Sequence, residues 1–207
     1  MSWTLGIFIF DDVEVLDFCG PFEVFSVTRL DAAKRMETSS PFDVRLIAAT
    51  ADPISTRGGM RVTPDHSIAD CPDLDILLVP GGVGTRPLID DEPTIDWLRT
   101  VGGEVELLTS VCTGSLLLAA AGHLTGRPAT THWMALDLMA ERFPDVTVVR
   151  DRHFVIDGAI ATSAGISAGI DLSLRLVSQL CGEAAGRETA RYMEYPYPES
   201  DHRRIES

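Results

Sequence analysis

Cys112 is the residue whose setting most clearly predicts chemistry. A predicted strand over residues 105–111 runs directly into a predicted helix over 113–121, and Cys112 stands at the junction. A junction with no loop residues forces a sharp turn that holds the side chain above the sheet, as in the nucleophile elbows of other α/β folds. The positive end of the following helix favours a thiolate there, so we expect the pKa of Cys112 to be lowered. Gly114 leaves room for close backbone packing.

Three further cysteines are scattered along the chain without CxxC spacing, namely Cys19, Cys71 and Cys181. This spacing is no zinc signature, and in a reducing compartment it predicts no disulfide framework. Most free cysteines are small buried apolar residues, which is our interpretation of these three.

Short apolar runs alternate with helical patterns along the chain. Alternation of this kind predicts parallel βαβ units and hence an α/β fold, a doubly wound and mostly parallel sheet with helices on both faces. We expect strands at 5–10, 44–49, 76–79 and 105–111, a short strand at 146–149 and a hairpin of 153–156 with 159–162; we expect helices at 21–33, 91–101, 113–121, 131–143, 165–181 and 183–193.

No linker or internal repeat divides the sequence. We therefore predict one domain over residues 1–195, a polar C-terminal tail over 196–207, and an exposed loop at 30–42. Gly20-Pro21 is expected to open the helix at 21–33, because proline is favoured in a first helical turn.

The chain of 207 residues carries 31 acidic and 17 basic residues, a formal charge of −14. A surface this negative repels phosphate backbones, so we expect no nucleic-acid partner. No apolar run is long enough to span a membrane, and the first residues have no leader-peptide pattern. We therefore expect a cytoplasmic protein without a membrane partner that acts on a small molecule.

Four segments together resemble the ThiJ/PfpI superfamily, which has a flavodoxin-like, class I glutamine-amidotransferase-like fold. They are LDFCGP (16–21), LLVPGGVG (77–84), TSVCTGSLLLAAAGHLTGRPATTHW (109–133) and TSAGISAGIDL (162–172). The resemblance covers about residues 5–195 in the right order. The CTGS elbow joined to LD-x-x-GP is most similar to the isocyanide hydratase branch, and related stretches occur in the sensing domains of AraC-type regulators.

The resemblance implies a role for Cys112 as nucleophile and for Asp17 as its acidic partner. Much of the superfamily has glutamate in place of Asp17, so aspartate favours the hydratase branch. The alternative for Asp17 is an N-cap near the start of a helix, a common role of aspartate.

The resemblance also implies backbone donors beside the sulfur. One donor would be the N–H of Gly82, which follows Gly81 in the Pro80-Gly81-Gly82 loop. The second would be the N–H of Thr113. The alternative for this loop is a tight turn that requires positive φ. The Thr113 side chain is expected to bond Asp17 or the sulfur.

Two residues near the elbow separate the possible reactions. Amidase-like members place histidine directly after the nucleophile, and Thr113 at that position removes the obvious proton carrier for amide hydrolysis. His132 aligns with a histidine that recurs near the pocket, and it would either polarise Cys112 or only pack beside Trp133.

The resemblance therefore implies a hydro-lyase, an isocyanide hydratase-like enzyme that needs no cofactor or metal and that is a homodimer. Cys112 would form a thioimidate while Asp17 acts as general acid and base, and water would release an N-substituted formamide. The alternatives are a glyoxalase- or deglycase-like enzyme of the same superfamily, and a non-catalytic ligand- or redox-sensing homologue of the AraC-type domains. The sequence shows no helix-turn-helix module, so we expect no direct DNA regulation.

Overall fold

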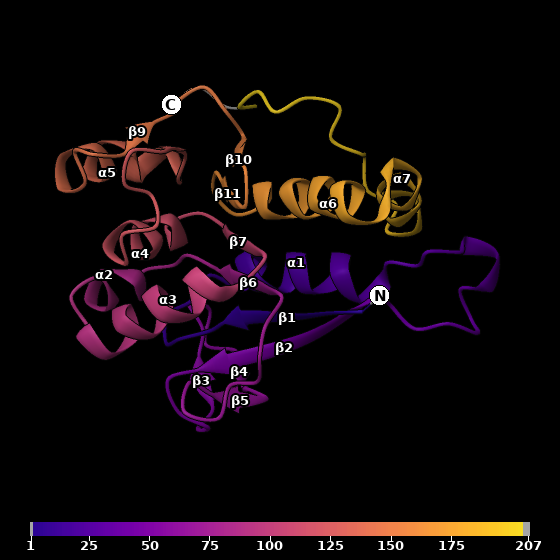
Figure 1. Cartoon of the computed structure of the whole chain (residues 1–207), viewed down its shortest axis with the longest axis horizontal. Helices are drawn as coiled ribbons and strands as arrows, with labels where there is room; N and C mark the ends of the chain where they lie inside the picture. The colour runs from indigo at the N-terminus through magenta and orange to yellow at the C-terminus, as the bar shows by residue number, and fades with distance from the viewer. Residues whose placement is uncertain (1, 205–207) are drawn as a thin grey trace.

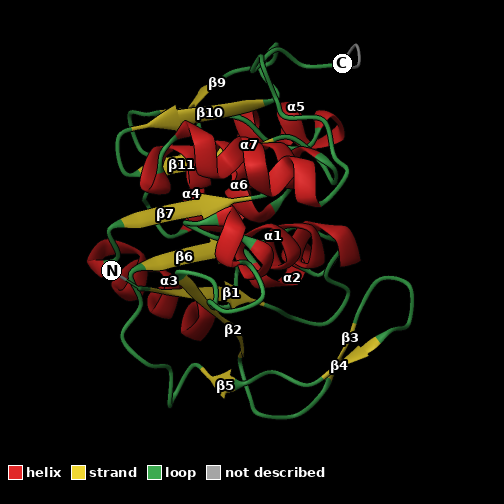
Figure 2. Cartoon of the chain, turned by 90° about the vertical axis from the view of Figure 1, so that its right-hand side faces the viewer, coloured by secondary structure: helices red, strands yellow, loops and turns green. Residues whose placement is uncertain are grey.

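The computed structural model describes residues 2–204 of the chain. Its centre is a seven-stranded sheet with the order β10-β11-β7-β6-β1-β2-β5 (Figure 2). β10 runs antiparallel to β11, and the other neighbouring strands are parallel. The strands are β1 (Trp3–Phe8), β2 (Phe42–Ala48), β5 (His66–Ser67), β6 (Ile76–Val79), β7 (Leu107–Ser110), β10 (Phe154–Asp157) and β11 (Ile160–Ser163). The doubly wound, mostly parallel α/β sheet expected from the sequence is confirmed.

Helices cover both faces of the sheet. α6 packs against both α1 and α7, and these three helices lie together in Figure 1. The chain crosses from β1 to β2 in one direction and from β6 to β7 in the other, and because such crossovers are right-handed, the connecting helices lie on opposite faces. The two groups are α1 (Val15–Val27), α6 (Ala168–Cys181) and α7 (Glu183–Tyr192) on one face, and α2 (Thr85–Leu88), α3 (Glu92–Glu104) and α4 (Gly114–Ala120) on the other.

The central strands are buried on both faces, which explains their continuous apolar sequences. Leu5, Ile7 and Phe8 of β1 are at most 1% exposed, and so is every residue of β6. Because β1, β6, β7 and β11 are parallel, the segments that follow them meet at one edge of the sheet. That edge brings together the sequence after β1, the Pro80-Gly81-Gly82 loop and Cys112.

The first helix begins six residues earlier than expected. The helix predicted at 21–33 is α1, and Pro21 lies inside it. Gly20 is there for packing, because a Cβ on it would lie 2.8 Å from Cγ1 of Ile170 on α6. Gly20-Pro21 therefore marks a close contact between two helices, and the shift places Asp17 in the first turn of α1.

The region around residue 131 also differs from its prediction. The helix expected at 131–143 is a 3-10 turn (Trp133–Ala135) followed by α5 (Leu136–Arg142). Thr131 is fully buried before the turn, and its hydroxyl donates to the carbonyl of Cys112 at 2.9 Å. This bond holds Thr131 in an extended loop.

Several short strands lie outside the main sheet. The strand expected at 146–149 is β9 (Thr147–Val148), which pairs with β8 (Pro128–Ala129). β3 (Ile54–Ser55) and β4 (Arg61–Val62) form a small hairpin that the sequence did not predict. The hairpin expected at 153–162 is confirmed as β10 and β11, with Gly158 at φ +64° in its turn.

We call residues 195–204 the C-terminal strap. It consists of Tyr195 and residues 196–204 of the predicted polar tail. Residues 205–207 of that tail lie outside the described residues. The strap returns over α6 toward β9 and β10 (Figure 1). Asp201 accepts on its carbonyl from the N–H of His153 at 2.6 Å, and Arg203 donates its N–H to the carbonyl of Asp151 at 2.8 Å. These two bonds attach the strap to the segment that leads into β10.

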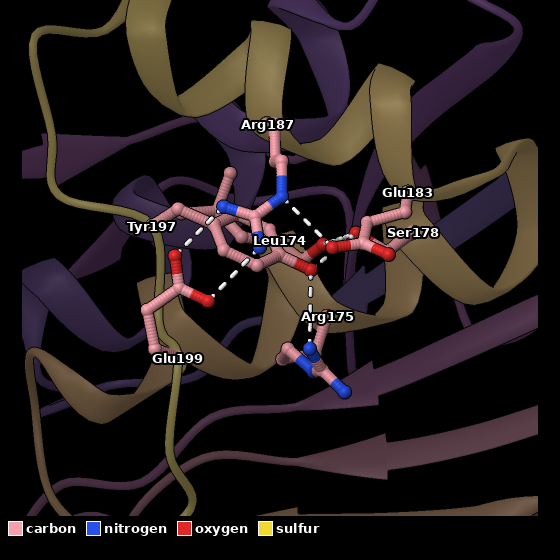
Figure 3. Close-up of polar contacts among 7 residues, drawn as sticks. All are labelled: Leu174, Arg175, Ser178, Glu183, Arg187, Tyr197 and Glu199. Carbon is pink, nitrogen blue, oxygen red and sulfur yellow. Dashed lines mark hydrogen bonds and ion pairs between the residues drawn. The ribbon is translucent and has the colours of Figure 1, made fainter.

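A cluster on α6 and α7 anchors the start of the strap (Figure 3). Arg187 donates to both carboxylate oxygens of Glu199 at 2.7 and 2.9 Å, and its Nε donates to Glu183 at 2.8 Å. The Arg187 guanidinium lies 4.4 Å from the ring centroid of Tyr197, whose hydroxyl is 2.7 Å from Ser178 Oγ. Within residues 2–204, no helix is long and apolar enough to cross a membrane.

Candidate active site

Cys112 lies on a strained turn between β7 and α4. Its φ is +56°, in the left-handed region that residues with a side chain rarely adopt. Its backbone N–H is shared between the carbonyls of Ser163 and Ala164, at 3.2 and 3.1 Å. Gly114 is required two residues later, because a Cβ there would overlap the carbonyl oxygens of Val79 and Pro80. The sharp turn expected at Cys112 is present.

Asp17 is the partner of Cys112. Its carboxylate is fully buried, and Oδ2 accepts from the N–H of Gly81 at 2.9 Å. A side-chain hydrogen bond joins it to the Cys112 thiol. Its other oxygen, Oδ1, has no hydrogen-bond partner among the described residues. No side chain caps α1, whose N-cap is Glu14, so Asp17 does not serve as the helix cap considered above.

Burial raises the pKa of Asp17 to about 7, against the opposing hydrogen bonds from the Gly81 N–H and the Cys112 thiol. Burial also raises the pKa of the Cys112 thiol, and the Asp17 charge adds to this effect. The sequence predicted a lowered pKa at Cys112 from the end of α4. The N–H groups of Thr113 and Ile166 do act in that direction, but desolvation of a side chain in a residue only 6% exposed outweighs them.

The glycine loop after β6 is bonded differently from the expectation. The N–H of Gly82, predicted to lie free beside the sulfur, donates to Thr113 Oγ1 at 3.0 Å. The Thr113 hydroxyl in turn donates to the Gly82 carbonyl at 3.2 Å, so it holds the loop and bonds neither Asp17 nor the sulfur. Gly81 has no room for a side chain, since a Cβ would lie 2.8 Å from that of Cys112. Gly82 has φ +132°, as the tight-turn alternative requires.

Ile166 supplies a backbone donor that the sequence analysis missed. Its N–H bonds both Cys112 and Asp17, and its φ of +56° matches that of Cys112. β11 runs almost directly into α6 at this point, as β7 runs into α4. The segment TSAGISAGIDL contains a second strand-to-helix junction. That junction is the sequence feature from which this donor could have been predicted.

His132 lies near the pair without bonding it. Its Nδ1 accepts from the N–H of Met134 at 3.3 Å, and its ring lies against Gly165. The ring centroid is 5.8 Å from that of Trp133. Desolvation, with smaller effects from Arg203 and Arg86, lowers the pKa of His132. The packing interpretation of His132 therefore fits the geometry.

A cavity of about 430 Å³ lies against Ile166, the residue next to the pair. It is lined by Gly165 and Ile166, which follow β11, and by His132, Trp133 and Arg203. Ile166, whose N–H bonds Cys112 and Asp17, links the cavity lining to the pair. The space is large enough for a small organic molecule.

The other cysteines are half-buried and free, and burial raises the pKa of each of Cys19, Cys71 and Cys181. In the described part of the chain, no group of three His, Cys, Asp or Glu side chains is placed to hold a metal ion. At this edge of the sheet a thiol lies beside a carboxyl group whose pKa burial raises to about 7.

Comparison with known proteins gives a consistent result. A model of the DJ-1/PfpI family matches residues 4–179. Isonitrile hydratase from Pseudomonas putida is 37% identical over 202 residues, covering 97% of this chain and 82% of that protein. A crystal structure of a ThiJ/PfpI family protein from Pseudomonas syringae has a TM-score of 0.82 and 28% identity, covering 97% of this chain and 78% of the other.

A transcription regulator is similar over part of its length. The HTH-type transcriptional regulator CdhR from Pseudomonas aeruginosa is 34% identical over 164 residues. The match covers 78% of this chain but 48% of the regulator, so the chain spans about half of the regulator's length.

Proposed function

The chain belongs to the DJ-1/PfpI family, and we propose that within it the protein is an isocyanide hydratase, which adds water to an isocyanide to give an N-substituted formamide. One observation carries the proposal: the thiol of Cys112 is bonded to the buried carboxyl group of Asp17, whose pKa burial raises to about 7. The full-length similarity to an isonitrile hydratase supports it.

The terminal carbon of an isocyanide accepts both a nucleophile and a proton. In the first step the Cys112 sulfur attacks this carbon, and the thiol proton passes through Asp17 to the same carbon. A C–S bond and a C–H bond form, the S–H bond breaks, and the product is a thioimidate on Cys112. A carboxyl group with a pKa near neutrality both accepts and releases a proton at modest cost, as this step requires.

In the second step water attacks the thioimidate carbon while the Asp17 carboxylate takes a proton from it. Asp17 passes this proton to the imine nitrogen, where it becomes the N–H of the formamide. The C–S bond then breaks as the new hydroxyl on the carbon loses its proton to form the carbonyl, and that proton returns to the sulfur. The free oxygen of Asp17, Oδ1, is the group available to bond that water.

Backbone donors hold the sulfur in place during both steps. The N–H groups of Thr113 and Ile166 bond Cys112 Sγ and stabilise negative charge that develops on it. Thr113 fixes the glycine loop through Gly82, which in turn positions the Gly81 N–H on Asp17. His132 takes no proton in this scheme.

Turnover of phenyl isocyanide to formanilide by the purified protein tests the proposal. Wild type is expected to turn over many equivalents, and Cys112→Ala none, with unchanged thermal melts. Failure of the wild type to produce any formamide would refute the proposal.

A second candidate, a ligand-sensing protein, is favoured by the similarity to CdhR. It predicts stoichiometric modification of Cys112 without turnover. A glyoxalase-like enzyme would instead consume methylglyoxal through Cys112. Offering both substrates to the same preparation therefore distinguishes the three functions.

A further inference from the structure

We propose that the cavity beside Cys112 binds a carboxylate on the substrate through Arg203 of the C-terminal strap. The inference rests on the proposed function and gives it a substrate class, an isocyanide that carries a carboxylate on a short apolar body.

Arg203 is linked to the reacting atoms through two residues, Ile166 and Thr131. Arg203 and Ile166 both line the cavity, and the N–H of Ile166 bonds Cys112 and Asp17. A second connection runs through Thr131, which accepts on its carbonyl from Arg203 at 3.1 Å and donates its hydroxyl to the Cys112 carbonyl at 2.9 Å. A ligand in this cavity would therefore contact both Arg203 and Ile166, the residue whose N–H bonds the reacting pair.

Arg203 is held in a fixed position. Its Nε donates to the carbonyl of Arg150 at 2.8 Å, and its Nη2 donates to Thr130 Oγ1 at 3.0 Å as well as to Thr131. These bonds orient a half-buried guanidinium before a ligand arrives, which lowers the entropic cost of binding.

The charge of Arg203 is not neutralised by a salt bridge within residues 2–204. Its Nη1 makes no hydrogen bond to the described residues, and the nearest acid acting on it, Asp151, forms no ion pair with it. Its neighbours differ, since Arg204 pairs with buried Asp171 at 3.0 Å and Arg152 pairs with Asp201 at 2.5 Å. Arg203 therefore keeps a donor and a full charge for a ligand.

The remainder of the cavity suits an organic anion. Its described lining includes Arg203 and Arg204 and no acidic residue. Arg203 lies close enough to His132 to add to the effect of desolvation in lowering the pKa of that ring. The side chains of Trp133 and Ile166 are 44% and 38% exposed and offer an apolar surface for the body of the ligand.

The test compares two substrates of nearly equal size, 4-isocyanobenzoate and its methyl ester. Wild type is expected to show a KM for the carboxylate about 10-fold or more below that for the ester. Arg203→Gln is expected to raise the KM for the carboxylate by roughly 10- to 100-fold, the range for a lost charged hydrogen bond. The decisive readout is the ratio of the two KM values, which should fall toward 1 in the variant.

Two variants control for charge and for folding. Arg99→Gln removes one positive charge from α3, where Arg99 pairs with Asp96, and should change neither KM. Arg203→Lys keeps the charge but loses the planar guanidinium, and it should retain part of the preference for the carboxylate. Equal KM values for the two substrates in wild type, or no change in Arg203→Gln, would overturn the inference while leaving the proposed function intact.

Calorimetry with the corresponding formamides separates this inference from the proposed function. 4-Formamidobenzoate is expected to bind wild type, and both its methyl ester and Arg203→Gln should bind at least 10-fold more weakly. Binding of this kind without turnover of either isocyanide would refute the hydratase and support the anion site. Absence of any difference between the two formamides would overturn the anion site.

Discussion

Cys112 and Asp17 share a buried environment that raises the pKa of both, and the charge of Asp17 raises the pKa of Cys112 further. The two groups therefore titrate as a pair. Below a pH of about 7 the pair holds two protons, and above it the pair holds one, which lies on the sulfur or on the carboxylate. The proposed mechanism uses the form with one proton, because Asp17 must accept the thiol proton before passing it on.

The pH dependence of turnover follows from this pairing. We predict that kcat/KM for a neutral isocyanide rises with pH, with an apparent pKa of about 7, and then reaches a plateau. No fall is expected in the range in which free thiols ionise, since the pKa of Cys112 is raised. A profile that rises only near pH 9 would mean that ionisation of the thiol alone limits the reaction.

Asp17 also makes stability depend on pH. Its pKa is 3.8 in an unperturbed setting and about 7 in the folded chain, so its contribution to stability is fully present below pH 3.8 and is lost as pH rises through 7. We predict that Asp17→Asn, which cannot become charged, gains stability relative to wild type by up to about 4 kcal/mol between pH 4 and pH 8. Urea unfolding of both proteins at pH 4 and pH 8 measures the difference in their free energies of unfolding. A difference that does not change with pH would contradict the raised pKa of Asp17.

Side chains of the site could be predicted from the sequence better than its backbone donors. Cys112 was recognisable from its strand-to-helix junction, and Asp17 from the segment that resembles the family. The role of Gly82 was mistaken, and that of Ile166 was missed, because the direction of an N–H depends on how separate segments pack. The pKa of Cys112 depends on burial in the same way.

At the scale of elements, the site is formed by two strand-to-helix turns, at Cys112 and at Ile166. Each has a residue with positive φ in the short turn between a strand and a helix, and backbone N–H groups at both turns bond the same sulfur. Glycines permit the close packing around the first turn. The sequence predicted most elements because continuous apolar runs alternate with helical patterns. α1 began earlier than expected because Gly20-Pro21 serves packing against α6.

Gly114 provides a test at this scale. We predict that Gly114→Ala destabilises the fold by several kcal/mol, of the order of 3, because its Cβ would overlap backbone carbonyls that cannot move aside. Gly103→Ala on α3 is the matched control: a Cβ there meets no atom within 4 Å, so it should stabilise the helix by about 0.5–1 kcal/mol. Equal urea midpoints for the two variants would contradict the packing at the elbow.

At the scale of the whole molecule, the strap joins the C-terminal end of the described chain to the cavity. Its anchoring depends on Arg187, Tyr197 and Glu199, which are far in sequence from Cys112 and Asp17 (Figure 3). The sequence predicted only a polar tail there, since contacts over such a distance leave no local pattern. The proposed substrate class therefore depends on the most distant segment of the chain.

The assembly of the molecule remains a prediction from the family resemblance. We predict a homodimer, with a mass by light scattering of twice the 22.5 kDa of the chain at micromolar concentration. A particle of 22.5 kDa under those conditions would contradict it.

The central claim is that Asp17 carries a proton between the Cys112 thiol and the substrate carbon. Turnover of phenyl isocyanide by wild type and Asp17→Asn, side by side, tests it most directly. Asparagine keeps the size of the side chain and an acceptor for the Gly81 N–H but cannot cycle a proton, so the rate should fall by about 10²–10⁴-fold. Alkylation of Cys112 should persist in the variant, which shows that the thiol is intact. Turnover at the wild-type rate by Asp17→Asn would contradict the account.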